Sequence, residues 1–335
     1  MKNLLVTNAI KRLGVWEKFR SVKPYLSRYA RGSVVYDDEM HELQRYGQDG
    51  PFPRQYGTGA EAYLSRYDAY GAQAGLRCVA IVLRWKAIQA ALGGQAGAPD
   101  WRADWQRAAA YAYWSTRAQY AFQARIRADF EAGRRPQYAR MLLLRDVGGH
   151  LGDLVALGWL DWAVALARGA LHWVEHDGFM DGDDDDGCRR TQLFVLRLVS
   201  SWQGWPERST PRCACDEPLY NALLEHWRTP DTALIEQLLL AACDRHTHQA
   251  REDHASRPIF FDLGSGDWAY DPFEVLAVMR LREQAGLANP TIDHPLMNTP
   301  LGQLPERSAP YDDELLASVV PRMRAELGGY WDASA

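Results

Sequence analysis

Apolar residues recur at three- and four-residue steps over most of this chain, and this spacing constrains the fold more than any other feature. One such run covers residues 60–92 and ends at Gly93-Gly94. A second run begins after Asp100 and continues to residue 130, shortly before Gly133. Glycine directly after a periodic run is a typical helix stop, so both runs are predicted to be long helices.

The same spacing predicts further helices at residues 141–144, 151–174, 189–201, 218–227, 229–249, 272–285 and 312–327. The helix at 151–174, which follows Gly148-Gly149, is apolar on most sides and is expected to be central and buried. Candidate strands at residues 33–36 and 258–261 are too short to build a sheet. The predicted fold class is all-α: an antiparallel helical bundle or helical-repeat-like array with a short N-terminal arm.

The chain has 335 residues, which is enough for one large or two ordinary domains. We expect an N-terminal arm at residues 1–57 and helical domains at 58–180 and 188–330. A net charge of -5 argues against a dedicated nucleic-acid binder. No run approaches the roughly 18 apolar residues of a membrane helix, and five scattered cysteines fit reduced thiols. A cytoplasmic location is the expectation.

His172-Trp-Val-Glu175-His176 matches the H-x-x-E-H pattern of inverted zinc peptidases. The spacing places both imidazoles on one helical face, where they could hold zinc while Glu175 activates a water molecule. A third ligand is required, and Glu252 is a candidate only by its distance along the chain. The alternative is two histidines at the exposed end of a buried helix. It is favoured, because the spacing alone supplies no third ligand.

An acidic segment follows this helix. Its carboxylates are Asp177, Asp181, Asp183, Asp184, Asp185 and Asp186. In the register of an EF-hand loop, Asp186 stands where glycine is required and Gln192 where glutamate is required, which disfavours calcium. One alternative is a solvated surface loop. The other is a binding surface, because clustered carboxylates attract a basic partner such as a nuclease active site and accelerate encounter with it.

The last third of the chain carries a strong helix-start signal at Asp271-Pro272-Phe273-Glu274. Asp271 is predicted to cap the helix, Pro272 to occupy its first position and Glu274 to complete a capping box. Gly286 is predicted to end the helix. The prolines that follow, including Pro295, predict an extended segment packed along the helices. No nucleophilic Ser or Cys accompanies the neighbouring Asp293-His294 pair, so this region is interpreted as structural.

Residues 230–305 resemble the C-terminal half of the PoNi-like immunity proteins, bacterial antidotes encoded beside nuclease effectors of the type VI secretion system. The likeness is carried by Asp271, Pro272, Glu274, Arg280, Arg282, Asp293, His294 and Pro295. Residues 60–230 are similar only in helical layout, and residues 1–55 not at all.

The resemblance implies a cytoplasmic protein without catalytic residues, cofactor or metal, which neutralises a cognate toxin, expected to be a DNase, by occluding its active site. The acidic residues between 177 and 186 are the expected contacts, and neither nucleic acid nor membrane is an expected partner. Two alternatives stay open. They are a zinc hydrolase using His172, Glu175 and His176, and a helical adaptor protein.

Overall fold

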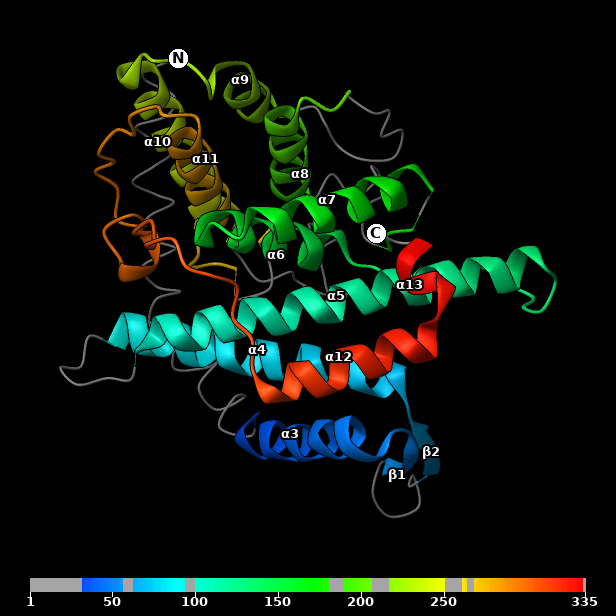
Figure 1. Cartoon of the computed structure of the whole chain (residues 1–335). Helices are drawn as coiled ribbons and strands as arrows, with labels where there is room; N and C mark the ends of the chain where they lie inside the picture. Colours follow the sequence, from blue (N-terminus) through cyan, green and yellow to red (C-terminus); the bar gives the residue numbers. More distant parts are fainter. Residues whose placement is uncertain are drawn as a thin grey trace, which may run out of the picture. The chain divides into compact units, whose positions relative to one another are not determined.

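The computed structural model describes residues 32–56, 63–93, 100–176, 178–180, 189–206, 217–250, 261–263 and 268–333. Over these ranges the chain forms eleven α-helices, one short 3-10 helix and a single two-stranded sheet (Figure 1). The all-α fold class predicted from the apolar spacing is confirmed. Within the same ranges, every helix is too short or too polar to cross a lipid bilayer.

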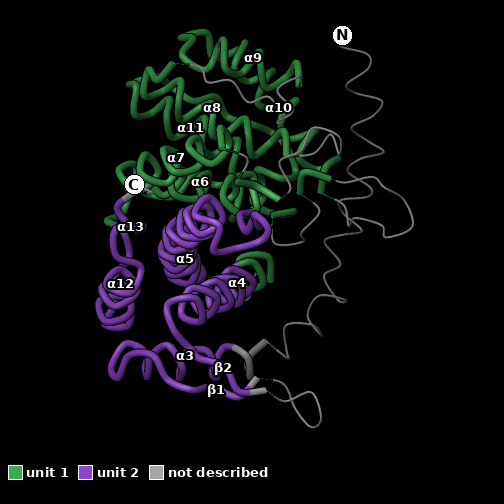
Figure 2. The backbone as a smooth tube through the Cα atoms, turned by 90° about the vertical axis from the view of Figure 1, so that its right-hand side faces the viewer, with its two compact units in different colours: residues 1–25, 88–99, 143–309 green, residues 26–87, 100–142, 310–335 purple. Residues whose placement is uncertain are grey.

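The backbone separates into two compact units, each built from segments that are far apart in the sequence (Figure 2). Unit 1 comprises residues 1–25, 88–99 and 143–309, and unit 2 comprises residues 26–87, 100–142 and 310–335. These divisions do not coincide with the boundaries expected near residues 57 and 180–188. The reason is that the C-terminal helices complete the packing of helices from the first half of the chain.

Unit 2 contains α3, the hairpin β1–β2, α4 as far as residue 87, α5, α12 and α13. Their bounds are Gly32–Asp49, Phe52–Tyr56, Tyr63–Tyr67, Ala69–Gly93, Trp101–Glu131, Glu314–Leu327 and Gly329–Ala333. Helix α12 packs against α3 and α5, and α13 packs against α5. Asp100 caps α5 by accepting a hydrogen bond from the Arg102 N–H at 3.1 Å, as expected for an aspartate at this position.

Helix α3 corrects the expectation that residues 1–57 form an appended arm. Leu43 and Tyr46 have no exposed area, and the Tyr46 hydroxyl donates a 2.7 Å hydrogen bond to Glu326 in α12. The segment 33–36, read from sequence as a candidate short strand, is part of this helix. This part of the chain is therefore integral to unit 2, because Leu43, Tyr46 and Phe52 contribute to its core.

The first long helix begins later than predicted. Residues 63–67 form β2, which pairs with β1 in an antiparallel hairpin, and α4 starts only at Ala69. Tyr67 fits the helical spacing, but its ring stacks on Phe52 of β1 with centroids 5.1 Å apart. A cross-strand aromatic pair of this kind stabilises a hairpin, and here it decides the local structure.

Unit 1 contains α6, α7, α8, α9, α10, α11 and the 3-10 helix η3. Their bounds are Leu144–Leu157, Leu160–Glu175, Arg190–Gln203, Pro218–His226, Thr232–Gln249, Phe273–Gln284 and Pro300–Gly302. Helix α6 contacts α7, α8 and α11. It is the most enclosed helix of the unit, with eleven of its fourteen residues buried.

The central helix is α6, and the prediction of a single buried helix at 151–174 is wrong. Gly148 and Gly149 lie inside α6 because they permit close packing. A Cβ on Gly148 would lie 2.7 Å from the Gln192 Cα, and one on Gly149 would lie 2.4 Å from the Trp268 ring. The break falls at Gly158, whose φ of 80° lies in the left-handed region and ends α6.

Two helix starts also differ from the sequence expectation. Asp231, not Thr229, caps α10, and its carboxylate accepts hydrogen bonds from the Ala233 and Leu234 N–H groups at 3.0 and 3.2 Å. Helix α11 begins at Phe273 after Pro272, and no side chain caps it. Glu274 is directed into the core instead of back to the helix start. The predicted stop at Gly286 is confirmed, with φ of 73°.

Candidate functional site

The residues that carried the family resemblance lie in unit 1, and most of them are buried. Glu274 and His246 have no exposed area, and the His246 Nδ1 lies 2.8 Å from the Glu274 Oε1. The His246 Nε2 lies 3.2 Å from the carbonyl oxygen of Ala269. A carbonyl can only accept, so Nε2 carries a proton. The arrangement ties α10 to α11 and to the turn that precedes α11.

A second buried cluster in unit 1 is centred on Asp262. Its carboxylate accepts hydrogen bonds from the Arg190 and Thr191 N–H groups and from the Thr191 hydroxyl, at 2.9–3.2 Å. It thereby caps the start of α8 from a position 71 residues away along the chain. Arg245 binds the same carboxylate at 2.9 Å. The cluster therefore joins α8 and α10 through one aspartate.

Arg245 illustrates the electrostatics of this cluster. Burial by itself lowers the pKa of Arg245, but Tyr220, Asp262 and Glu217 outweigh this effect and the pKa is raised. Burial also raises the pKa of Tyr220 well above its ordinary value. The guanidinium therefore stays charged and the phenol stays neutral, which suits a structural ion pair.

The two arginines of α11 donate hydrogen bonds mainly to backbone carbonyl groups. Arg282 has no exposed area and donates to the carbonyl oxygens of Trp227, Thr229 and Ala288 at 2.6–2.8 Å. Burial lowers the pKa of this guanidinium. Arg280 donates to the Ala156 and Pro305 carbonyls and to the Glu283 carboxylate. Burial lowers the pKa of Arg280 as well, with Glu283 acting in the opposite direction.

His294 is held by backbone and by α10, not by its neighbour in the sequence. Its Nδ1 accepts a hydrogen bond from the Leu296 N–H at 3.1 Å, so Nε2 carries the proton. That nitrogen lies 3.5 Å from the Asp244 Oδ1. Asp293 is exposed and accepts from the Asn298 amide, and Pro295 is half-buried in the extended segment. These contacts fit the structural interpretation of this region.

The H-x-x-E-H motif lies at the C-terminal end of α7. The His172 and His176 rings are 4.2 Å apart between centroids, and the His176 Nδ1 lies 2.7 Å from the His172 carbonyl oxygen. Glu175 is exposed. Among the described residues, no three His, Cys, Asp or Glu side chains gather as metal ligands. Glu252, the third ligand considered from sequence, lies outside those residues.

The six aspartates expected to contact a toxin also lie outside the described residues. They are Asp177, Asp181, Asp183, Asp184, Asp185 and Asp186. Two residues that bracket residues 181–188 are buried in unit 1, namely Phe179 and Arg189, which are 4 % and 6 % exposed. The Arg189 guanidinium donates to the Phe261 carbonyl at 3.1 Å. Met180, in contrast, is 55 % exposed beside the first aspartate of that segment.

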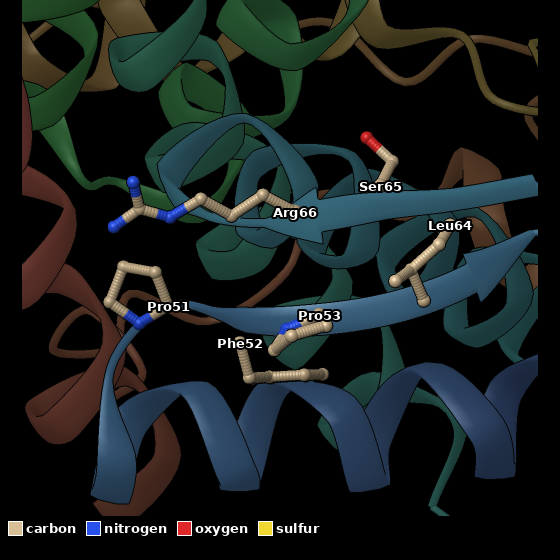
Figure 3. Close-up of a pocket in the computed structure, with 6 residues that line it drawn as sticks. All are labelled: Pro51, Phe52, Pro53, Leu64, Ser65 and Arg66. Atoms are coloured by element: carbon tan, nitrogen blue, oxygen red, sulfur yellow. The ribbon is translucent and has the colours of Figure 1, made fainter.

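A separate surface feature is a hollow of about 410 Å³ on the hairpin of unit 2 (Figure 3). Its lining consists of Pro51, Phe52, Pro53, Leu64, Ser65 and Arg66. Leu64 is 71 % exposed, the largest value among the exposed large apolar side chains. Sequence reasoning missed this feature because it assigned residues 60–67 to a helix. Two features of the sequence indicate strands here and could have revealed the hollow. They are the Pro51-Phe52-Pro53 segment and the alternation of large and polar residues that leads to Tyr67.

Comparison of the chain with protein-family models, with curated protein sequences and with solved structures finds no match among any of the three.

Proposed function

We propose that this protein is an immunity protein, which binds a cognate toxin of the nuclease class and blocks its active site. The observation that carries the proposal is the acidic segment between α7 and α8. Phe179 and Arg189, on either side of residues 181–188, are buried in unit 1, so five of the six aspartates lie within a few residues along the chain of a buried side chain. A cluster of negative charge is complementary to the basic surface with which a nuclease binds phosphates.

The buried contacts of the family-like residues support the same proposal. Glu274, Arg280 and Arg282 are engaged by the protein's own backbone and side chains, which is the role expected of a scaffold. In a binding protein of this kind, a stable framework carries the recognition residues on a separate and more variable surface. The resemblance to PoNi-like proteins then reflects a shared framework, and the toxin contacts lie on the acidic surface.

Met180 is a candidate for an apolar contact with the toxin beside the acidic segment. It is exposed directly beside the acidic segment, and methionine adapts its shape readily at a binding surface. Interfaces combine a central apolar anchor with charged groups that steer encounter. We therefore place the toxin-binding surface around Met180 and the segment that follows it. Inhibition of a toxin inside the producing cell requires a cytoplasmic location.

The test is co-expression with the toxin candidate encoded beside this gene. The expected result is rescue of growth and co-purification of the two proteins from the cytoplasmic fraction. The variant that tests the surface is Met180→Glu, which adds a charge at the proposed anchor, leaves the buried residues unchanged and is expected to weaken toxin binding. Rescue that fails with the wild-type chain contradicts the immunity function. Rescue by the Met180→Glu variant with unaltered affinity contradicts the placement of the surface.

A further inference from the structure

We propose that the outer edge of β2 binds an extended acidic segment of a partner protein, which pairs with it as an antiparallel third strand. This surface belongs to unit 2 and carries the exposed cation Arg66. It is therefore distinct from the acidic surface proposed for the toxin in unit 1. The proposal goes beyond the immunity function and does not depend on it.

The register of the hairpin shows which backbone groups are available. Pro53 pairs with Arg66, and because proline has no N–H, this pair must be a non-hydrogen-bonded one. Pairs alternate along an antiparallel ladder, so Leu64 belongs to the same class. The N–H and C=O groups of Leu64 and Arg66 therefore point to the outer edge of β2. Neither residue makes a hydrogen bond to the part of the chain that the structure describes.

The side chains of this edge form one continuous strip. Successive residues of a strand point to opposite faces, so Leu64 and Arg66 share the face that also carries Pro53. Phe52 and Tyr67 lie on the other face and are buried. Leu64, Arg66 and Pro53 line the hollow described above, and Figure 3 shows Leu64 and Arg66 on β2 and Pro53 on the neighbouring β1.

The charge of the strip specifies the partner. Arg66 is exposed and forms no ion pair with the described residues. Arg54, on the same hairpin, is in contrast paired with Glu39 at 2.8 Å. The Arg66 cation lies on a strand edge that makes no hydrogen bond to the described residues, and it is complementary to a carboxylate, although the chain as a whole is acidic.

The geometry of the strand edge predicts a short sequence pattern in the partner. In an antiparallel pairing, the residue opposite Arg66 precedes the residue opposite Leu64 by two positions, and both lie on the same face. A partner segment with Glu or Asp, then any residue, then an aliphatic residue satisfies both contacts. The backbone of the two outer residues of that pattern exchanges hydrogen bonds with Arg66 and Leu64, as in other cases of strand addition.

The test uses the full-length chain and a capped, fluorescent peptide, Ser-Thr-Glu-Thr-Val-Thr-Ser, in a titration followed by anisotropy. Binding is expected, with slower amide exchange at Leu64 and Arg66. N-methylation of the peptide's Glu removes an N–H directed at β2 and is expected to weaken binding about tenfold. N-methylation of the Thr between Glu and Val alters an N–H directed away from β2. This matched control is expected to bind as the parent peptide does.

Two protein variants locate the site. Leu64→Pro removes an outward N–H without touching the ladder, as Pro53 does in β1, and is expected to abolish binding. Arg66→Glu is expected to reverse the preference, so that a peptide with Lys in place of Glu binds more tightly. Arg135→Glu, an exposed charge reversal beyond the end of α5, is the matched control and leaves binding unchanged. Circular dichroism and the thermal midpoint check that each variant is folded.

Three results overturn the proposal. The first is absence of binding by the wild-type chain at peptide concentrations up to about 1 mM, the weak end of specific recognition. The second is equal binding of the peptides methylated at Glu and at Thr, which means that the backbone does not pair. The third is self-association of the chain that Leu64→Pro abolishes, because the edge then accepts a second copy and not an acidic partner.

Discussion

His246 and Glu274 form a pair in the core of unit 1, with 2.8 Å between the imidazole Nδ1 and the carboxylate Oε1 and no exposed area on either side chain. The two residues are 28 positions apart, and they join α10 to the first turn of α11. The Nε2 proton is also engaged, by the Ala269 carbonyl. The pair therefore connects three separate backbone segments.

Replacing either His246 or Glu274 alone is expected to lower the free energy of unfolding far more than replacing both. Glu274→Leu leaves His246 buried beside an apolar group, and breaking a buried pair in this way costs about 3–5 kcal/mol. Replacing both side chains by leucine avoids the uncompensated polar group. Urea unfolding of the two single variants and the double variant measures this. A double variant whose loss equals the sum of the two single losses contradicts a direct coupling.

Close packing at Gly149 gives a second prediction. A Cβ at this position would lie 2.4 Å from the Trp268 ring atoms, so Gly149→Ala forces the indole or α6 to move. Overpacking of this kind costs about 1–3 kcal/mol. Gly93→Ala is the matched control, because no atom of the described residues lies within 4 Å of its added Cβ. We expect a lower thermal midpoint for the Gly149 variant only. Equal midpoints for the two variants contradict the assigned contact.

These glycines also show where reasoning from sequence succeeds and where it fails. The periodic spacing correctly predicted α5, α8, α12 and the stop of α11, because each is decided by neighbouring residues in the chain. Gly148-Gly149 looked like a break, but the partners that require glycine there, Gln192 and Trp268, are distant in sequence. A local pattern cannot distinguish a glycine that ends a helix from one that admits a neighbouring side chain.

The candidate sites also divide into features that depend on neighbouring residues and features that depend on residues distant in sequence. The sequence indicated that the segment around Asp271–Pro295 is structural, and the buried contacts of Glu274 and Arg282 fit this interpretation. It did not indicate that Glu274 pairs with His246, since local capping chemistry predicted a bond back to the helix start. The capping role of Asp262 was not predicted for a similar reason, because it caps α8 from a different part of the chain. Such pairings depend on tertiary packing.

Buried tyrosines predict how stability depends on pH. Burial raises the pKa of Tyr46, Tyr111, Tyr120 and Tyr220, and hydrogen bonds to Glu326 and Asp313 add to this for the first two. Above a pH of about 10, an unfolded tyrosine loses its proton while each of these retains it. The unfolded state then binds fewer protons, so the free energy of unfolding falls as the pH rises.

Tyr120→Phe isolates one such contribution. The Tyr120 side chain is 0 % exposed, and this burial raises the pKa of its hydroxyl. Above a pH of about 10, each such tyrosine contributes a slope of about -1.4 kcal/mol per pH unit. Urea unfolding from pH 7 to 11 is expected to show a shallower alkaline decline for the variant than for the wild-type chain. Parallel curves over this window contradict a raised pKa at Tyr120.

The acidic segment gives the last prediction, which rests on the proposed immunity function. Replacing Asp183, Asp184, Asp185 and Asp186 together by serine removes the charge that accelerates encounter with a basic toxin surface. Electrostatic steering of this kind changes association rates by about tenfold or more at low salt. The variant is therefore expected to associate more slowly with the toxin domain, and its association rate is expected to depend less on salt concentration.

Stopped-flow association at several salt concentrations measures both effects. The matched control replaces four acidic residues elsewhere on unit 1 by serine, and these are Asp161, Glu225, Glu236 and Glu306. It removes the same net charge, so a general effect of charge slows both variants equally. A specific role for the segment slows only the first. An unchanged association rate at low salt excludes the segment from the interface but leaves toxin binding through another surface intact, because growth rescue reports on binding separately.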